Sequence, residues 1–206
     1  MKPETREKAP AALGVTSGVA VRLRPVVELS PDQLLELSAL NRDLRLEITS
    51  EGELVVMNPT GGWSSRRNAT ATSRLVVWAE RDGTGVAFDS SGGFVLPNGA
   101  IRSPDASWVE NTRLEALSPE EREKYLPLCP DFVVELLSPS DVLGATQEKM
   151  QEYLENGARL GWLLVPASKR VYVYRPGQQI EELENPEYLP GAPVLPGFVL
   201  DPREVW

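Results

Sequence analysis

Short apolar, β-prone runs alternate along this chain with longer stretches in which apolar residues recur at helical spacing. The run 132–137, Phe-Val-Val-Glu-Leu-Leu, is short, largely apolar and β-prone, and it predicts the most buried strand. Asn98-Gly99 is a strong signal for a hairpin turn. The other expected strands are short and are separated by turn-forming residues: 44–49, 53–57, 86–89, 94–96, 106–109, 162–165 and 171–174.

Helices are expected between these strands, and their ends carry capping signals. Ser30 with Gln33 three residues later forms a capping box at the start of the first helix. Gly157 follows the last helix as a natural C-terminal cap. The expected helices share apolar residues at helical spacing or a cap at one end: 30–40, 64–81, 117–125 and 146–156.

The order of these elements predicts a mixed α/β (α+β) fold with a central mixed β-sheet flanked by helices. A length of 206 residues suits a single domain, expected to span 25–206. The segment 1–24 begins charged and rich in Pro and Ala, and we expect a disordered leader there. No apolar run is long enough for a membrane span or a secretory signal, which favours a cytoplasmic protein.

Two carboxylates occupy positions that a plain protein core would not favour. Glu135 lies in the middle of the buried strand 132–137, and Asp105 begins the expected strand 106–109. A buried ionised Glu loses several kcal/mol of hydration unless a partner compensates its charge, and a second carboxylate nearby adds repulsion. If the two strands pair, a divalent cation between the carboxylates would remove both objections. The pattern therefore predicts a metal site.

The residue inventory restricts the chemistry of that site. Histidine is absent, which excludes a Ser-His-Asp triad, a histidine general base and histidine-containing zinc or iron sites. Cys129 is the single cysteine, so neither an intrachain disulfide nor a cysteine-rich zinc site can form. Oxygen ligands remain, and they favour Mg²⁺, Mn²⁺ or Ca²⁺.

Lys149 lies on the helix expected to follow the strand that carries Glu135. Tyr153 stands four residues later, on the same face of that helix. A metal, two carboxylates and a lysine suffice for phosphodiester hydrolysis, because the metal polarises the phosphoryl oxygen and activates a water. The lysine would steady that water, help deprotonate it or neutralise charge in the transition state.

At these residues the sequence resembles the PD-(D/E)-x-K nuclease superfamily, and in particular a bacterial family of restriction endonucleases sometimes called Uma-two. The resemblance covers roughly 30–206 and is carried by an ordered series of short motifs. The matching motifs are Arg45-Leu46-Glu47-Ile48, Gly52-Glu53-Leu54-Val55, Arg102-Ser103-Pro104-Asp105, Pro130-Asp131-Phe132-Val133-Val134-Glu135, Ser138-Pro139-Ser140, Lys149, Tyr153, Gly157 and Trp162-Leu163-Leu164-Val165. The resemblance implies a restriction-endonuclease-like fold with the metal ligands on strands.

The resemblance also implies roles for individual residues. Asp105 and Glu135 would bind the metal, Mg²⁺ or Mn²⁺, and Glu47 would act as an outer ligand or hold a metal-bound water. The superfamily's lysine normally stands two positions after the second acid, where this chain has Leu137. Lys149 on the following helix is therefore the candidate. The family often has a histidine after its Pro/Gly turn, and its role does not transfer because this chain has none.

Each candidate residue also has a simpler interpretation. Asp105 could cap a turn or a strand, Glu47 could be a strand residue facing water, and Lys149 could be a solvated lysine on a helix surface. Asp131 is better explained as a strand-start cap than as a ligand. Glu135 has the weakest simpler interpretation, because apolar residues flank it on both sides.

We therefore expect a metal-dependent, endonuclease-like phosphodiesterase acting on DNA. The alternative is a catalytically weak or inactive nuclease-fold module that binds or regulates. The net charge of −9 argues against a broad basic surface for nucleic acid, although a local groove of arginines stays compatible with it. A homodimer is a further expectation, because cutting both strands of a duplex often needs two sites.

Overall fold

A computed structural model describes residues 18–206. Its centre is a six-stranded sheet in which all neighbouring strands are antiparallel except β8 and β9, which are parallel. The strands in spatial order are β11 (Glu181–Glu184), β10 (Arg170–Tyr174), β9 (Leu160–Val165), β8 (Phe132–Leu136), β7 (Ala106–Glu110) and β4 (Gly85–Asp89). The expected mixed sheet is therefore confirmed.

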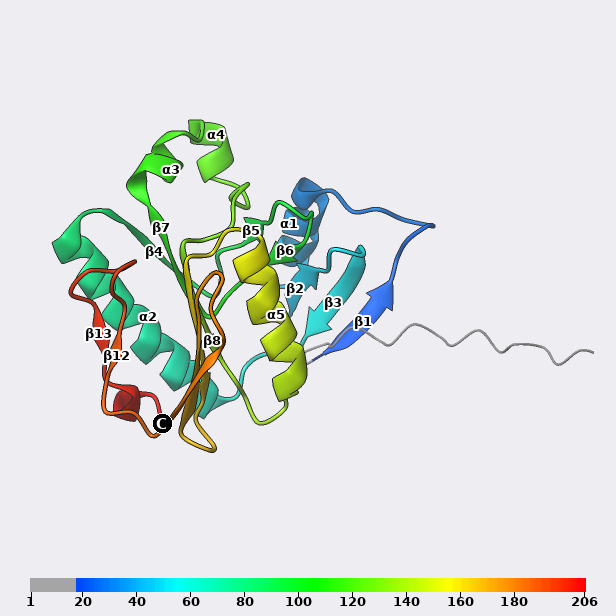
Figure 1. Cartoon of the computed structure of the whole chain (residues 1–206). Coiled ribbons are helices and arrows are strands. Elements are labelled where there is room, and N and C mark those ends of the chain that lie inside the picture. The colour runs from blue at the N-terminus through cyan, green and yellow to red at the C-terminus, as the bar shows by residue number, and fades with distance from the viewer. Residues whose placement is uncertain (1–17) are drawn as a thin grey trace, which may run out of the picture.

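Two helices cover the central sheet, α2 (Gly62–Asp82) on one face and α5 (Leu143–Glu155) on the other, as Figure 1 shows. The α2 face is also covered by the C-terminal segment with β12 (Leu189–Pro190), β13 (Val199–Leu200) and a short 3₁₀ helix (Pro202–Glu204). Coverage of both faces explains why β8 and β9 are buried throughout and are apolar apart from Glu135.

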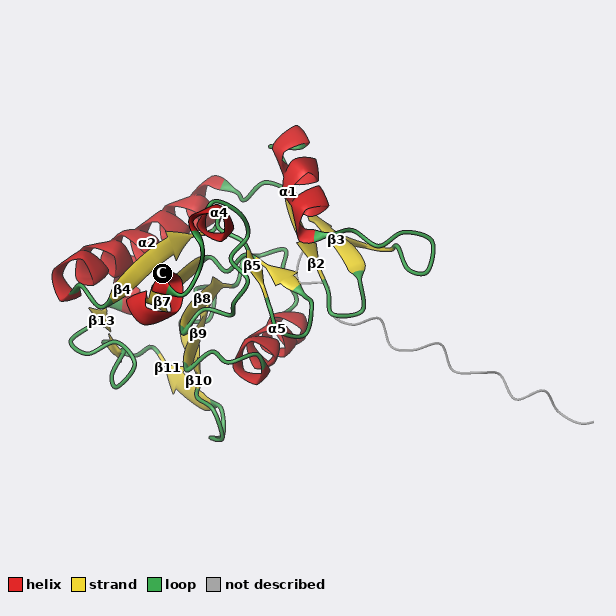
Figure 2. Ribbon diagram, turned by 90° about the horizontal axis from the view of Figure 1, so that it is seen from above, coloured by secondary structure: helices red, strands yellow, loops and turns green. Residues whose placement is uncertain are grey.

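A second, five-stranded sheet lies beside the central one. Its spatial order is β1 (Val19–Arg22), β3 (Glu53–Met57), β2 (Arg45–Ile48), β6 (Ile101–Arg102) and β5 (Phe94–Val95). Helix α1 (Pro31–Leu40) packs on one of its faces, away from α2 (Figure 2). The short connection from β6 to β7 joins the two sheets, so residues of both sheets meet there.

Local sequence signals explain the ends of several elements. The capping box of α1 is present, with Ser30 Oγ accepting from Gln33 N at 3.2 Å and Gln33 Oε1 accepting from Ser30 N at 2.8 Å. The Asn98-Gly99 hairpin forms between β5 and β6. Gly161 on β9 lets α5 approach closely, because a Cβ there would lie 2.5 Å from Met150 Cε.

Some boundaries differ from the expectation. Residues 1–17 lie outside the described part, whereas Val19–Arg22 of the expected leader pair with β3 as strand β1. The helix expected at 117–125 is the shorter α4 (Pro119–Arg122). Helix α3 (Asn111–Glu115), which precedes it, was not predicted. Helix α5 begins at Leu143, three residues before the expected start.

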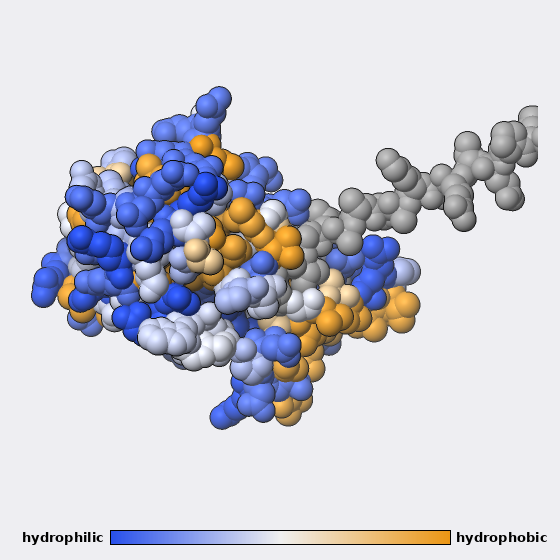
Figure 3. Space-filling model, turned by 90° about the horizontal axis from the view of Figure 1, so that it is seen from below, coloured by the Kyte–Doolittle hydropathy of each residue, from blue (hydrophilic) through white to orange (hydrophobic). Residues whose placement is uncertain are grey.

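The surface over β1 and the loop after it is apolar, as the orange region beside the grey trace in Figure 3 shows. Val19, Val21 and Val26 are among its exposed side chains. None of the helices within 18–206 combines the length and apolar character that crossing a membrane requires.

Candidate functional site

The site lies where the two sheets meet, and strand register builds it. In the antiparallel β7–β8 pair, Ala106 stands opposite Val134, so the next residues outward are Asp105 and Glu135. Alternation along β8 puts Glu135 on the same face as Val133, which packs against α5. The expected pairing of the two strands is thus confirmed, and it brings the two carboxylates to one end of the central sheet.

Asp105 is buried, and donors reach both of its carboxylate oxygens. Oδ1 accepts from Asn68 Nδ2 of α2 at 2.8 Å and from Arg45 Nη1 of β2 at 3.2 Å. Oδ2 accepts from the backbone N–H of Leu136 at 2.8 Å, one residue beyond Glu135. Asp105 therefore ties the central sheet to both α2 and the smaller sheet.

Glu135 is buried on β8, and α5 supplies its partners. Lys149 Nζ lies 2.9 Å from Oε1, and the Tyr153 hydroxyl donates to the same oxygen at 3.0 Å. Oε2 accepts no hydrogen bond from any residue in 18–206. One carboxylate oxygen of Glu135 is therefore left for a ligand.

Glu47 completes the cluster from β2. Its Oε1 accepts from Lys149 Nζ at 2.9 Å and from the backbone N–H of Ser103 at 3.0 Å, and its Oε2 pairs with Arg102 Nη1 at 3.2 Å. Arg102 in turn pairs with Glu152 of α5 at 2.6 Å. Glu47 does not face water, and Lys149 is not a solvated surface lysine.

The two glutamates that share Lys149 have opposite pKa shifts. Burial raises the pKa of Glu135 to about 7, since the attraction of Lys149 is offset by repulsion from Asp105 and Glu47. Burial also disfavours the charged form of Glu47, but Lys149, Arg102 and Arg45 together lower its pKa to about 2. Burial opposes the charge of Lys149 as well, yet Glu135 and Glu47 raise its pKa above the ordinary value, so it remains an ammonium.

These contacts revise the argument that a buried Glu135 requires a metal. Lys149 and Tyr153 already compensate the carboxylate, so burial alone does not demand a cation. The raised pKa nevertheless shows that the compensation is incomplete.

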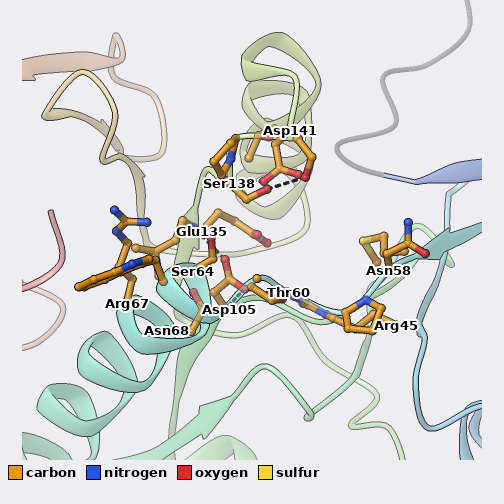
Figure 4. A pocket seen from close by; sticks show the side chains of 18 of the residues that line it. Arg45, Asn58, Thr60, Ser64, Arg67, Asn68, Asp105, Glu135, Ser138 and Asp141 are labelled. Atoms are coloured by element: carbon orange, nitrogen blue, oxygen red, sulfur yellow. Dashed lines mark hydrogen bonds and ion pairs between the residues drawn. The ribbon is translucent and has the colours of Figure 1, made fainter.

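A cavity of about 520 Å³ opens onto the carboxylates. Figure 4 shows Asp105 and Glu135 at its centre, between Arg67 on one side and Arg45 on the other. Ser138 and Asp141, from the segment before α5, form another wall. The cavity therefore gives a ligand access to the incompletely compensated carboxylate.

The donor set fits one hard cation that keeps part of its water shell. Asp105 and Glu135 would hold it, and Mg²⁺ commonly binds through one or two carboxylates with waters and substrate phosphates completing its shell. Within 18–206, no three Asp, Glu or Cys side chains are grouped to hold a metal ion. The free Oε2 of Glu135 favours the binding of such a cation. Asp105 could bind the cation only while its carboxylate also accepts hydrogen bonds from Arg45 and Asn68.

Sequence reasoning missed several side chains that shape the site. Arg45 lies two positions before Glu47 on β2, a spacing that puts both on one face of the strand and could have revealed it. Asn68 carried no comparable signal, because its contact with Asp105 spans the α2–β7 packing. Asp131 lies just before β8 and caps the neighbouring strand instead: it accepts from the backbone N–H of Glu110, the last residue of β7, at 3.0 Å and pairs with Arg113 at 3.0 Å.

Fold and site together define a restriction-endonuclease-like protein. A family model described as "Putative restriction endonuclease" matches residues 31–203, and the chain belongs to this family, Uma2. Among the curated proteins, none matches the chain.

A solved structure gives independent support for the fold. The chain is similar to the crystal structure of a protein from Anabaena variabilis described as a putative nuclease belonging to DUF820. The TM-score is 0.70 at 21% sequence identity, over 86% of this chain and 97% of that one. At this identity the likeness establishes the fold.

Proposed function

We propose that the chain is a metal-dependent phosphodiesterase that cuts DNA in the manner of an endonuclease. The geometry of Glu135 carries this proposal: it is a buried carboxylate at the cavity with Asp105 as its neighbour on the adjacent strand, and one of its oxygens has no donor within 18–206. Burial, which raises its pKa to about 7, agrees with this geometry. Carboxylates with strongly shifted pKa values that lie in a cleft beside a charged partner cluster at functional sites. Membership of a family of restriction endonucleases supports the same reading.

The chain's own residues divide the remaining work. The carboxylates of Glu135 and Glu47 raise the pKa of Lys149, so it acts as a fixed positive charge that stabilises negative charge developing on a phosphodiester. Glu47 and Tyr153 are positioning residues that fix the ammonium and Glu135. A bound Mg²⁺ or Mn²⁺ would be held by Asp105 and Glu135 and would supply Lewis-acid polarisation together with an activated water.

The alternative function is a nuclease-fold module that binds or regulates without cutting. One observation favours it: the carboxylates Asp105, Glu135 and Glu47 are already matched by Arg45, Lys149 and Arg102. These ion pairs hold the centre together without a metal, although Glu135 stays incompletely compensated. Cleavage and metal binding therefore have to be measured separately.

Incubation of supercoiled plasmid and linear DNA with Mg²⁺ or Mn²⁺ tests the proposal. We expect cleavage by the wild type and at least a hundredfold loss in Glu135→Gln and in Asp105→Asn, with calorimetry showing that both variants lose Mn²⁺ binding. Arg74→Gln is the matched control, because Arg74 pairs with Glu204 at the surface and lies outside the cavity. Absence of both cleavage and Mn²⁺ binding in the wild type would overturn the proposal in favour of the binding module.

The proposal also includes the oligomeric state of the protein. Cutting both strands of a duplex at one place commonly needs two active sites, so we expect a homodimer. Light scattering of the purified chain measures the mass directly, and a monomer at the concentrations used for cleavage would contradict this extension.

A further inference from the structure

One wall of the cavity is the first turn of α2, opposite Arg45. Gly61, Gly62, Trp63 and Ser64 line the cavity there, and Arg67 follows one turn later. Figure 4 places Ser64 and Arg67 on the same side of Asp105 and Glu135. The roles proposed above concern the carboxylates and Lys149, and they give this wall of the cavity no function.

Arg67 has no acidic partner among residues 18–206. The other arginines of the site are paired, Arg45 with Asp105 and Arg102 with Glu47 and Glu152. The Nε atom of Arg67 is buried and has no hydrogen-bond partner, and no ion pair of Arg67 occurs within 18–206. A guanidinium at a cavity wall with a buried, unpaired Nε–H suits an anionic ligand, and its planar donor geometry fits a phosphate.

The start of α2 adds further donors on the same wall. The N-cap is Gly61, which supplies no side-chain cap, and the first turn contains no acidic residue. The first helical hydrogen bond runs from Ser65 N to Gly61 O, so the N–H groups of residues 62–64 have no partner within the helix. A Cβ added at Gly61 or Gly62 would meet nothing within 4 Å, which leaves the backbone open to approach. An anion at this end would also meet the positive end of the helix dipole.

Trp63 provides an aromatic face at the rim of the cavity. Its side chain is 69% exposed although it is among the largest apolar groups of the chain. The Arg66 guanidinium lies 5.6 Å from the centroid of its ring. Exposed aromatic rings beside arginines are platforms on which nucleic-acid bases stack.

We propose that this wall binds an unpaired stretch of DNA, with a backbone phosphate held by Arg67 and the first turn of α2 and a base stacked on Trp63. The proposal rests on the proposed function and specifies the state of the DNA that enters the site, either a single strand or a stretch locally opened within a duplex, where opening costs unpairing energy. Bases in an intact duplex are stacked on one another, so Trp63 can only take a base that has left the helix. The cavity of about 520 Å³ matches the size range of small-ligand sites, and the net charge of −9 offers no broad surface for a duplex.

Binding of fluorescent oligonucleotides in EDTA, followed by anisotropy, tests the proposal without turnover. We expect a single-stranded 12-mer to bind at least tenfold more tightly than its duplex. Arg67→Gln should weaken single-strand binding about tenfold or more. Trp63→Ala should weaken it by about five- to a hundredfold, the range for loss of one stacked base, and Trp63→Phe should retain most of the affinity.

Arg74→Gln is the matched control, with the same charge change two turns further along the same helix and outside the cavity. Circular dichroism of each variant verifies that the fold is retained. Equal or tighter binding of the duplex would overturn the proposal, as would Arg67→Gln behaving like Arg74→Gln. Because no metal is present, binding as expected without any later cleavage would contradict only the proposed catalytic function.

Discussion

Glu47 and Glu135 sit on either side of one lysine and behave in opposite ways. Both lie on strands, both are buried, and Lys149 Nζ is 2.9 Å from an oxygen of each. The pKa of Glu47 is nevertheless lowered to about 2, while that of Glu135 is raised to about 7.

The difference follows from the number of partners each carboxylate has. Both carboxylate oxygens of Glu47 accept hydrogen bonds, including those from Arg102 and a backbone N–H, and the positive charge of Arg45 attracts the carboxylate further. Within 18–206, Glu135 has donors on one oxygen only, and it faces two other carboxylates. The negative charge of Glu47 is therefore fully compensated, and this residue has a structural role. The negative charge of Glu135 is only partly compensated, which favours the binding of a cation or a proton at the cavity.

Removing Glu47 should have the largest effect on stability. Glu47→Ala leaves the buried Arg102 and Lys149 with one carboxylate fewer each, and we expect a loss of about 3–5 kcal/mol in the free energy of unfolding. Denaturant titration measures it. Glu51→Ala, an exposed change in the same hairpin, is the control and should be almost neutral. A loss below about 1 kcal/mol for Glu47→Ala would show that this carboxylate is no better compensated than Glu135.

Replacing Glu135 should instead stabilise the protein at alkaline pH. Because the folded-state pKa of about 7 exceeds the ordinary 4.5, the folded state binds more protons between these values, and the stability of the wild type falls as pH rises through that window. Glu135→Gln cannot ionise, so we expect it to exceed the wild type by about 2 kcal/mol at pH 8 in EDTA. At pH 4.5 the advantage should vanish, which provides the internal control. An advantage independent of pH would contradict the assigned cause.

The lowered pKa of Glu47 predicts that stability depends on pH in the opposite direction at low pH. Its folded-state pKa of about 2 lies below the ordinary 4.5, so its contribution is present above pH 4.5 and is lost as pH falls toward 2. Acid titration of Glu135→Gln isolates this limb, because that variant has no raised carboxylate at position 135. Equal stability at pH 5 and pH 2.5 would contradict the strong compensation of Glu47.

The smallest effect is expected for Tyr153→Phe. The change removes one hydrogen bond to Glu135 without changing any charge, and we expect a loss of about 1 kcal/mol. The charged form of Glu135 also loses a donor, so the fall of stability with pH should move to higher pH. Thermal unfolding across pH 5–8 measures both effects, and an unchanged pH profile would show that the hydroxyl does not influence the ionisation of Glu135.

The sequence was most informative where the signal was local. The apolar run around Glu135 predicted a strand that is buried throughout, although β9 is equally buried, and the Ser30 capping box predicted the start of α1. Lys149 and Tyr153, four residues apart, were predicted to share a helix face, and both reach Glu135. Strand β1 was not expected, because its four residues form a strand only by pairing with β3.

The sequence by itself determined which chemistry is available: oxygen ligands, a lysine and arginines, with no histidine. It also determined the strand and helix that carry Glu135 and Lys149. Only the tertiary structure decided which charges meet, since Glu47 and Lys149 are 102 positions apart in the chain and Asp105 and Arg45 are 60 apart. Ionisation depends on burial and on charges within a few ångströms, and packing sets both. The ionisation state of each carboxylate therefore could not be predicted from the sequence pattern that identified the residue.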